Sequence, residues 1–475
     1  MAVVSVISIR IKYLAFIVFI LLLSIFTSKY SESGNYTNSQ HGDPTSGVTR
    51  SSIDSRYSGF SRGNCAHCHE PHASIGGSEP EPNTGVAAGP DKVLLFSEEE
   101  DVCLSCHNGV IVPRDMRTVV NKTYRHPITD YSGRHTLSKN EYGQNGAPFR
   151  GTNRHAECVD CHEPHYIGKP GTAYHSYNTT SPANNNLVSN LLKGVWGVEP
   201  TTEGTWLSPP TTFTELTTPG VGASKEYQIC FKCHSYYALQ DSDGITSIIG
   251  PSGQYITDQS MEFSKNLKSV HPVRVPLNNQ TGSYAPKALT ASQLRSPWNS
   301  APGSQTMWCS DCHNSDASSP VGPHGSNYKF MLNGTRKYWP ASSRGVLFSL
   351  NNVRNNENNW STELFCVNCH ILYDGNWKNN AHSNHDSRTY TPDGGSGSHP
   401  YYCITCHSVI PHGSPRSRLI VYRTDPQPYV YVNGTVIYAM LYGFKKASPT
   451  SYQGTNCYTP SSQCYRHNTN AGGYD

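Results

Sequence analysis

Fourteen of the 16 cysteines fall into seven copies of one pattern, Cys-x-x-Cys-His. Two thiols at this spacing can each add across a vinyl group of one porphyrin, and the histidine that follows then lies under the iron as a ligand. The pattern therefore predicts seven covalently attached haem c groups, each with a proximal histidine. In chain order, motifs 1 to 7 are Cys65/Cys68/His69, Cys103/Cys106/His107, Cys158/Cys161/His162, Cys230/Cys233/His234, Cys309/Cys312/His313, Cys366/Cys369/His370 and Cys403/Cys406/His407.

Two other chemistries use the same residue types. Paired Cys-x-x-Cys units build tetrahedral zinc sites, but seven pairs cannot all couple two by two, and zinc requires no histidine after every second cysteine. Disulfides within each motif suit an exported chain, but they also leave the histidines unexplained. Cys457 and Cys464 do not fit the haem spacing, and they predict a short-loop disulfide, with a free redox-active pair as the alternative.

Fifteen of the 22 histidines lie outside the motifs, many of them in Gly/Pro-rich turns rather than on periodic apolar faces. A second imidazole closes a haem iron, and only six methionines are present, so we expect bis-histidine coordination. His155 and His399 are secondary candidates for the second ligand, and His67, His135, His175 and His467 are interpreted as non-ligands. The predicted distal ligands are His41, His72, His126, His165, His271, His324, His382, His385 and His412.

Two of these histidines follow a motif too closely to serve its own iron. His72 lies three residues beyond His69, so its backbone is tied to the proximal side of that haem. The same holds for His165 after His162. We therefore expect both to bind a neighbouring iron, in the same chain or in an adjacent subunit.

The elements that must position these residues are short. Among 475 residues, only 36% are hydrophobic, and 40 Gly, 32 Pro and 30 Tyr favour turns. The predicted fold is mostly irregular coil with short helices and a C-terminal β-hairpin, wrapped around a stack of haems that supply the missing core. Helices are expected in 97–107 and 285–296. The hairpin is expected in "YVYVNGTVIYAM" (429–440), turning at Asn433-Gly434, either as a capped unit or as an edge that pairs with another copy.

The N-terminus carries an export signal. Arg10 and Lys12 precede an apolar run from Tyr13 to Phe26, which is shorter than the ~20 residues that a bilayer requires. Residues 1–30 are therefore predicted to be a signal peptide, with an uncleaved anchor as the alternative, and the mature chain to be secreted, extracellular or on the cell surface. A four-motif region (31–290) and a three-motif region with the hairpin (291–475) follow. A net charge of +3 gives no indication of a nucleic-acid surface.

The segments "SQHGDPTSGVTR" (39–50), "GNCAHCHEPHASIGG" (63–77) and "RHAECVDCHEPH" (154–165) resemble the filament-forming extracellular cytochromes of the OmcE type. "CITCHSVIPHGSPRSRLI" (403–420) is similar to a segment common in secreted multihaem cytochromes. The resemblance implies a head-to-tail homopolymer of bis-histidine haems in which one histidine completes a haem of the neighbouring subunit. Carried over, that histidine is His72, with His41 as the alternative. The OmcE type has four haems, whereas this chain has seven motifs.

These features favour an electron-conducting heptahaem cytochrome, polymerised as an extracellular filament (a cytochrome nanowire), over an enzyme. A multihaem reductase requires one open iron in a polar pocket, but every motif ends in His and the spare imidazoles outnumber the irons. A monomeric periplasmic or surface electron carrier is the other alternative. The partners expected for the filament-forming cytochrome are other copies of the chain, other redox proteins and extracellular acceptors.

Overall fold

The fold is mostly irregular, as the composition predicts. A computed structural model describes residues 36–69, 94–96, 98–129, 155–168, 187–249, 255–277, 289–318, 320–355, 360–372, 385, 388–392, 394–444 and 457–458. His72, His382 and Cys464, like the predicted signal peptide, lie outside these residues. Among the described residues, no helix combines the length and the apolar character needed to cross a bilayer.

The helices are short. The α-helices are α3 (Glu99–Leu104), α4 (Met116–Val120), α6 (Cys158–Cys161), α7 (Glu226–Cys230), α8 (Tyr236–Leu239), α9 (Gln259–Glu262), α10 (Cys309–Cys312), α11 (Leu350–Asn355) and α12 (Trp360–Glu363). The 3-10 turns are η1 (Ser55–Tyr57), η2 (Cys65–His67), η4 (Asn190–Leu192), η6 (Ala291–Gln293), η7 (Lys329–Met331), η8 (Phe365–Asn368), η9 (Cys403–Thr405) and η10 (Ser417–Leu419). The helix expected in 97–107 is present as α3. Of the helix expected in 285–296, the described residues 289–296 contain the single 3-10 turn η6, and 285–288 lie outside the described residues.

The strands form antiparallel pairs and no larger sheet among the described residues. The pairs are β1 (Tyr124–Arg125) with β7 (Gly325–Ser326), β2 (Gly197–Pro200) with β3 (Phe213–Leu216), β4 (Ile245–Ile249) with β5 (Tyr255–Thr257), β6 (Ser269–Val270) with β10 (Gly413–Ser414), β8 (Thr389–Tyr390) with β9 (His399–Pro400), β11 (Val432–Asn433) with β12 (Val436–Ile437), and β13 (Gly443–Phe444) with β14 (Cys457–Tyr458).

The hairpin β11–β12 confirms the expected C-terminal hairpin, with a correction to its turn. Asn433 pairs with Val436, so Asn433 belongs to the strand and the two loop residues are Gly434 and Thr435. Gly434 has a φ of 61°, a left-handed conformation that glycine adopts without steric cost. Glycine in the first loop position is typical of type II′ hairpin turns.

Two strand pairs are built alike, and we call them the first clip (β1–β7) and the second clip (β6–β10). In each, one strand leads into His-Pro, at His126 or His271, and its partner strand begins just after Pro-His, at His324 or His412. A left-handed pair then follows each second strand. It comprises Phe330 and Met331 (φ 61° and 52°) in the first clip, and Arg418 and Leu419 (φ 63° and 55°) in the second.

The clips join residues far apart in the sequence and bring the two regions on either side of residue 290 into contact. Tyr124 pairs with Ser326, and Ser269 pairs with Ser414. A close backbone approach locks each clip: a Cβ at Gly325 would lie 2.0 Å from the Val119 carbonyl oxygen, and one at Gly413 would lie 2.1 Å from that of Glu262. The ends of α4 and α9 therefore rest directly on the clips, which is possible only with glycine at these positions.

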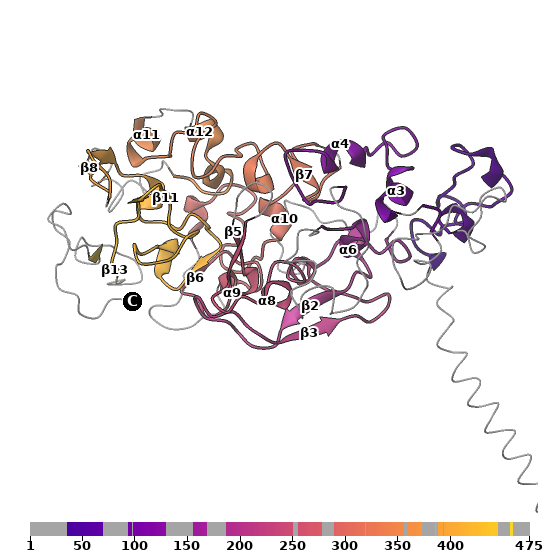
Figure 1. Cartoon of the computed structure of the whole chain (residues 1–475), viewed down its shortest axis with the longest axis horizontal. Helices are drawn as coiled ribbons and strands as arrows, with labels where there is room; N and C mark the ends of the chain where they lie inside the picture. Colours follow the sequence, from indigo (N-terminus) through magenta and orange to yellow (C-terminus); the bar gives the residue numbers. More distant parts are fainter. Residues whose placement is uncertain are drawn as a thin grey trace, which may run out of the picture.

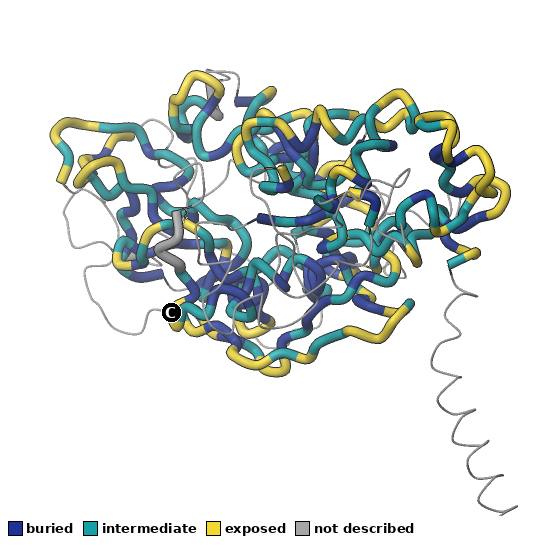
Figure 2. Tube along the Cα trace, turned by 45° about the vertical axis from the view of Figure 1, so that its right-hand side comes forward, coloured by how far each residue is buried: buried dark blue, intermediate teal, exposed yellow. Residues whose placement is uncertain are grey.

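The apolar core is divided into separate clusters along the molecule. Buried segments are spread over its whole length in Figure 2 rather than gathered at one centre. Several clusters include motif cysteines: the cluster around Phe231 and Trp298 packs against Cys309 and Cys312, and the cluster around Trp360 packs against Cys366 and Cys403. Cysteines of motifs 3 to 7 thus lie at core clusters.

The chain runs along the long axis of the molecule. In Figure 1 the N-terminal elements lie at the right, α10 and β7 near the middle, and β8, β11 and β13 at the left. Sequence order is therefore largely preserved in space, and the functional residues are distributed along the length of the molecule.

Candidate metal centres

All seven motifs adopt the same helical turn. In each, the backbone N–H of the histidine donates to the carbonyl of the first cysteine, at 2.8 to 3.0 Å. Residues at positions i, i+3 and i+4 of such a turn lie on one face, so the two thiols and the imidazole of a motif project to the same side. This arrangement presents three groups to one planar partner.

The fourteen motif cysteines form no disulfides with one another. Burial raises the pKa of Cys366, Cys369 and Cys403 to about 12. The intramotif disulfide interpretation therefore finds no support in these residues.

Consecutive motifs are neighbours in space, and their cysteines adjoin. Hydrogen bonds to Cys103 and Cys230, together with burial, raise the pKa of Cys158 and Cys309 well above the usual value. At the other four junctions burial raises the thiol pKa, and the cysteine of the neighbouring motif adds to the shift. The adjoining pairs are Cys68 with Cys106, Cys103 with Cys158, Cys161 with Cys233, Cys230 with Cys309, Cys312 with Cys369, and Cys366 with Cys403.

These junctions alternate. Motifs 1–2, 3–4 and 5–6 meet through their second cysteines, whereas motifs 2–3, 4–5 and 6–7 meet through their first cysteines. Each internal motif therefore uses one cysteine toward the preceding motif and the other toward the following motif. The seven motifs form one row in the order of the sequence.

The two outer cysteines of this row are Cys65 of motif 1 and Cys406 of motif 7, and the surroundings of Cys406 differ from those at the junctions. Cys406 is half-buried, and its backbone carbonyl accepts from Val421 N at 2.9 Å. It packs against an apolar cluster formed by Ile420, Tyr422, Leu441 and Phe444. Haem attachment at Cys406, as at the other motif cysteines, stays a prediction.

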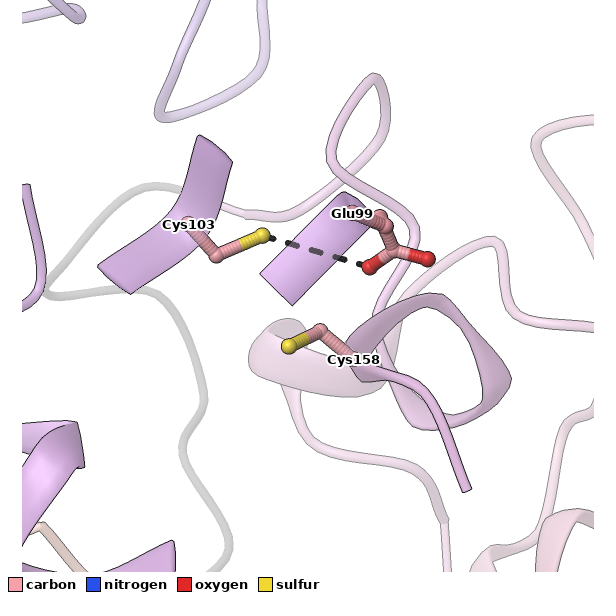
Figure 3. Close-up of side chains that lie close together, drawn as sticks. All are labelled: Glu99, Cys103 and Cys158. Atoms are coloured by element: carbon pink, nitrogen blue, oxygen red, sulfur yellow. Dashed lines mark hydrogen bonds between the residues drawn. The ribbon is translucent and has the colours of Figure 1, made fainter. Parts of the chain in front are cut away.

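One junction also brings a carboxylate close to two sulfurs. Glu99 lies with Cys103 and Cys158, and their ligand atoms are all within 4.8 Å of one another (Figure 3). The Cys103 thiol donates to Glu99 Oε1 at 3.9 Å. Because the two sulfurs are the first cysteines of motifs 2 and 3, this group is the contact between two motifs and not a separate metal site. It is the only three-ligand group found among the described residues, whereas zinc would require four ligands at each site.

Six motif histidines each face a second histidine from elsewhere in the chain. The ring centroids lie 6.0 to 6.3 Å apart. The pairs, with the motif histidine first, are His69–His165, His107–His41, His162–His324, His234–His126, His313–His412 and His370–His271.

This separation fits two imidazoles on opposite sides of one metal ion. A metal–nitrogen distance of about 2.0 Å on each side, with each ring centroid about 1.1 Å behind its nitrogen, gives about 6.2 Å between centroids. Some ring contacts without a metal are closer, as for Phe263 and His412 at 4.8 Å, and others are as wide, as for Tyr57 and Phe60 at 6.2 Å. What sets the six pairs apart is that each joins a motif histidine to a second histidine at this separation. The six pairs are therefore spaced for an ion between the rings, and the motif thiols beside them fit haem.

Hydrogen bonds orient the rings. The Nδ1 atoms of His126, His162, His271, His313 and His407 lie 2.6 to 2.9 Å from backbone carbonyl oxygens. A carbonyl can only accept, so Nδ1 carries the proton and the Nε2 lone pair is directed away, ready to bind a metal. The seventh motif shares this feature, since His407 donates to the Arg418 carbonyl as His313 donates to that of Phe330.

Burial keeps the imidazoles of four paired histidines neutral. It lowers the pKa of His107 and His313 to about 4, and that of His324 and His370 to about 3. Nearby histidines lower these values further. A neutral imidazole is the form that binds a metal, so burial favours ligation.

The structure brings six of the nine predicted distal histidines opposite a motif histidine. His72 and His382 lie outside the described residues, and the His385 ring packs on Tyr401 at 4.7 Å. Of the other histidines, His155 lies 3.6 Å from Glu157, and His399 packs on Tyr438 at 6.1 Å. His67 is fully buried, and its two ring nitrogens contact Ser61 O and Arg50 N.

The pairs follow a rule that was not apparent from the sequence. The histidine after an odd-numbered motif faces the motif histidine two motifs earlier: His165 faces His69, His324 faces His162, and His412 faces His313. Because His165 is tethered close to motif 3, we expected that it would not face His162, and it faces His69 instead. The even-numbered motifs are served from segments that precede them, by His41, His126 and His271.

Two carboxylates that contact distal histidines were missed from the sequence. Glu262 Oε2 lies 2.5 Å from His412 Nδ1, and Glu163 Oε1 lies 2.9 Å from His165 Nδ1. Glu163 lies within "CHEPH", whose repetition at motifs 1 and 3 could have drawn attention to it. Glu262 belongs to no motif and is 150 residues from His412, so the sequence carries no signal for it. Comparisons with protein families, curated proteins and solved structures find no match to this chain.

Proposed function

We propose that the chain is a c-type cytochrome with seven covalently bound haems that relays electrons along its row of motifs. The observation that carries this proposal is the set of six histidine pairs, each joining a motif histidine to one from another segment at 6.0 to 6.3 Å. Haem supplies reversible one-electron chemistry at its iron. The chain wraps these groups, which complete its divided apolar core.

The residues have separate tasks in this proposal. The motif cysteines anchor each group by thioether bonds, and the motif histidines bind the iron from one side. The loop histidines bind from the other side and leave no position for a reactant, so relay is favoured over catalysis. The junctions between cysteines of consecutive motifs, such as Cys103 with Cys158, keep neighbouring groups close. For motif 7, which Cys403 and Cys406 would anchor, the sequence names His382 and His385 as candidate second ligands within one chain, and in the homopolymer His72 of an adjacent subunit would take that position instead.

Polymerisation belongs to the proposal. His72 follows motif 1 in the same "CHEPH" context in which His165 follows motif 3. The histidines after motifs 3, 5 and 7 each face a motif two places earlier, and motif 1 has no such predecessor in its own chain. We therefore assign His72 to an iron of an adjacent subunit in a head-to-tail homopolymer, formed after export directed by residues 1–30. The acceptors would be other redox proteins or extracellular oxidants.

The first experiment tests haem content and coordination. The purified protein should contain seven haems, show a low-spin ferric spectrum, and give no spectral change with carbon monoxide. Replacing Cys309 and Cys312 by alanine should remove one haem, whereas Cys457→Ala should remove none. Fewer than seven haems in the native protein, or carbon monoxide binding to it, would contradict the proposal.

The second experiment tests assembly. Electron microscopy of material released from cells should show filaments, and dried filaments should conduct. His72→Ala should leave haem content almost unchanged and abolish filaments. His135→Ala, at a histidine interpreted as a non-ligand, is the control and should assemble normally. A native protein that stays monomeric at high concentration would indicate the single-molecule carrier instead.

A further inference from the structure

One of the six histidine pairs, His313–His412, has a hydrogen-bond partner of a different kind, the buried carboxylate of Glu262. Its carboxylate lies at the end of α9 and is fully buried, with 0% exposure. Oε2 lies 2.5 Å from His412 Nδ1, and Oε1 accepts from the Tyr429 hydroxyl at 2.8 Å. Both oxygens are therefore satisfied, one of them by a histidine that faces His313 of motif 5.

The other hydrogen-bonded imidazoles have weaker partners. Five of them donate Nδ1–H to backbone carbonyls, which carry no charge. His165 Nδ1 also contacts a carboxylate, that of Glu163, but this pair is open to solvent, with side chains 53% and 28% exposed. Water screens an exposed pair far more than a buried one. Among the described distal histidines, His412 is thus the one whose Nδ1 contacts a buried carboxylate.

The rings at motif 5 also differ in orientation from their equivalents. His165 and His324, which occupy the same place in the pairing rule, lie at 10° and 21° to their motif histidines. His412 lies at 74° to His313. Glu262 holds one edge of the His412 ring while Phe263, the next residue, packs against its face at 4.8 Å. These two neighbouring side chains therefore set the ring plane.

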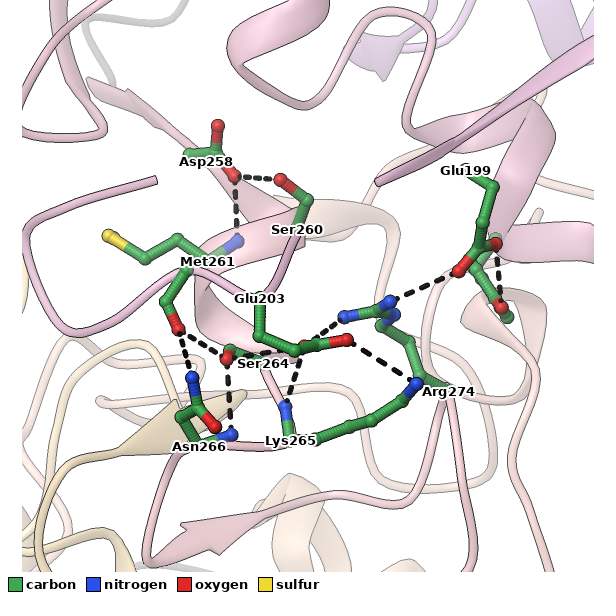
Figure 4. A network of polar contacts seen from close by, with 11 residues as sticks. Glu199, Glu203, Asp258, Ser260, Met261, Ser264, Lys265, Asn266 and Arg274 are labelled. Carbon is green, nitrogen blue, oxygen red and sulfur yellow. Dashed lines mark hydrogen bonds and ion pairs between the residues drawn. The ribbon is translucent and has the colours of Figure 1, made fainter. Parts of the chain in front are cut away.

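The position of Glu262 is itself fixed by its surroundings. Asp258 caps α9 by accepting from Ser260 Oγ at 2.6 Å and from Met261 N at 2.7 Å, and these bonds belong to the polar network shown in Figure 4. Ser264 then ties the end of α9 to the Gly204 carbonyl at 2.5 Å. The carboxylate is thus preorganised and does not have to move to meet His412.

We propose that Glu262 is a positioning residue that lowers the reduction potential of the fifth haem, acting through His412; the inference rests on the function proposed above. A charge-assisted bond to Nδ1–H draws the proton away and makes Nε2 a stronger donor. A stronger donor stabilises the ferric over the ferrous iron. The fifth centre is then oxidised more readily than its equivalents, which places an energetic step within the row.

The test compares Glu262→Gln with the native holoprotein by redox titration followed in the haem absorbance. Glutamine keeps the shape and an acceptor for His412 but removes the charge. One seventh of the absorbance change should move to a more positive potential, and the other six sevenths should stay. Electron paramagnetic resonance, which is sensitive to the angle between imidazole planes, should show one altered low-spin centre.

Glu163→Gln is the matched control, since it makes the same change on an exposed histidine partner, and it should shift its centre by much less. Seven bound haems and an unchanged unfolding midpoint establish that the variant is folded. With these in place, an unmoved titration would overturn the inference and leave the proposed function intact. A native protein that contains no haem would instead overturn the proposed function.

Discussion

The first and second clips share a backbone and differ in the electrostatics of the histidine that they carry. In both, a two-residue strand pair, a glycine under a carbonyl and a left-handed residue pair place a histidine opposite a motif histidine. In the first clip, His324 Nδ1 is buried without a hydrogen-bond partner among the described residues. In the second, His412 Nδ1 meets Glu262. The backbone therefore decides where an imidazole lies, and the side chain behind it decides how strongly it donates.

The largest expected effect is loss of coordination at one centre in either clip. His324→Ala and His412→Ala should each open one haem and give carbon monoxide binding at about one seventh of the total haem. Because the clips share their geometry, the two variants should bind equally. His67→Ala, at a buried histidine whose ring nitrogens contact Ser61 and Arg50, is the control and should bind none. Carbon monoxide difference spectra measure this, and binding by only one clip variant would break the equivalence.

The next effect tests the shared glycine. Gly325→Ala and Gly413→Ala each place a methyl group 2.0 to 2.1 Å from a carbonyl oxygen, so backbone must move. We expect the free energy of unfolding to fall by about 3 kcal/mol in each case, measured by denaturant titration. Gly59→Ala, where a Cβ meets nothing within 4 Å, should change it by less than about 0.5 kcal/mol. A large effect in one clip alone would show that only that clip is locked by its glycine.

A smaller effect should be confined to the second clip. Tyr429→Phe leaves one oxygen of the buried Glu262 carboxylate unsatisfied. The cost should be about 1–3 kcal/mol in the free energy of unfolding, measured by the same titration. The first clip has no such carboxylate on His324 Nδ1 among the described residues, so it offers no equivalent variant. The control is Tyr255→Phe at a tyrosine that is 42% exposed, which should leave the free energy of unfolding unchanged. A neutral Tyr429→Phe would mean that solvent or another group compensates at Glu262.

The smallest effect belongs to the first clip. Lys122 and Asp316 form an ion pair that connects the segment before β1 to the loop between α10 and β7. Asp316→Asn should reduce the free energy of unfolding by no more than about 1 kcal/mol, and the difference should shrink at high salt. Denaturant titrations at two salt concentrations measure it. A salt-independent loss would show that Asp316 acts instead through the hydrogen bond that its carboxylate accepts from Asn327 N.

The sequence predicts the local chemistry better than the long-range arrangement. The seven motif turns and a histidine set that contains six facing partners follow from spacing and from turn residues beside histidine. The pairing does not, because His324, which faces His162, is positioned next to the β1–β7 pair, whose strands of two residues are too short to show alternation. The repeated "PHGS" after motifs 5 and 7 was the available signal that the two segments are equivalent.

The errors in element prediction have physical causes. Phe330 and Arg418 adopt left-handed φ angles that are uncommon outside glycine, so residue preference gives no warning of them. The segment 285–296 has helix-forming residues, but Leu294 forms a bridge with His370 instead, so tertiary contact overrides propensity. Glu262 reaches His412 because α9 packs against the start of β10, a contact across 150 residues that no local sequence pattern predicts.

The two-motif offset of the pairing rule imposes an order on biogenesis. In the proposed cytochrome, a haem attached at His69 would have one open face until His165, 96 residues further along, had emerged. The same delay recurs at His162 and His313, whose partners also lie downstream. Even-numbered centres would be closed at once by imidazoles already exported. In a maturation intermediate, odd-numbered irons would therefore still have an open position while even-numbered irons would have both axial ligands. Premature oxidation of the growing chain would begin at the odd-numbered sites.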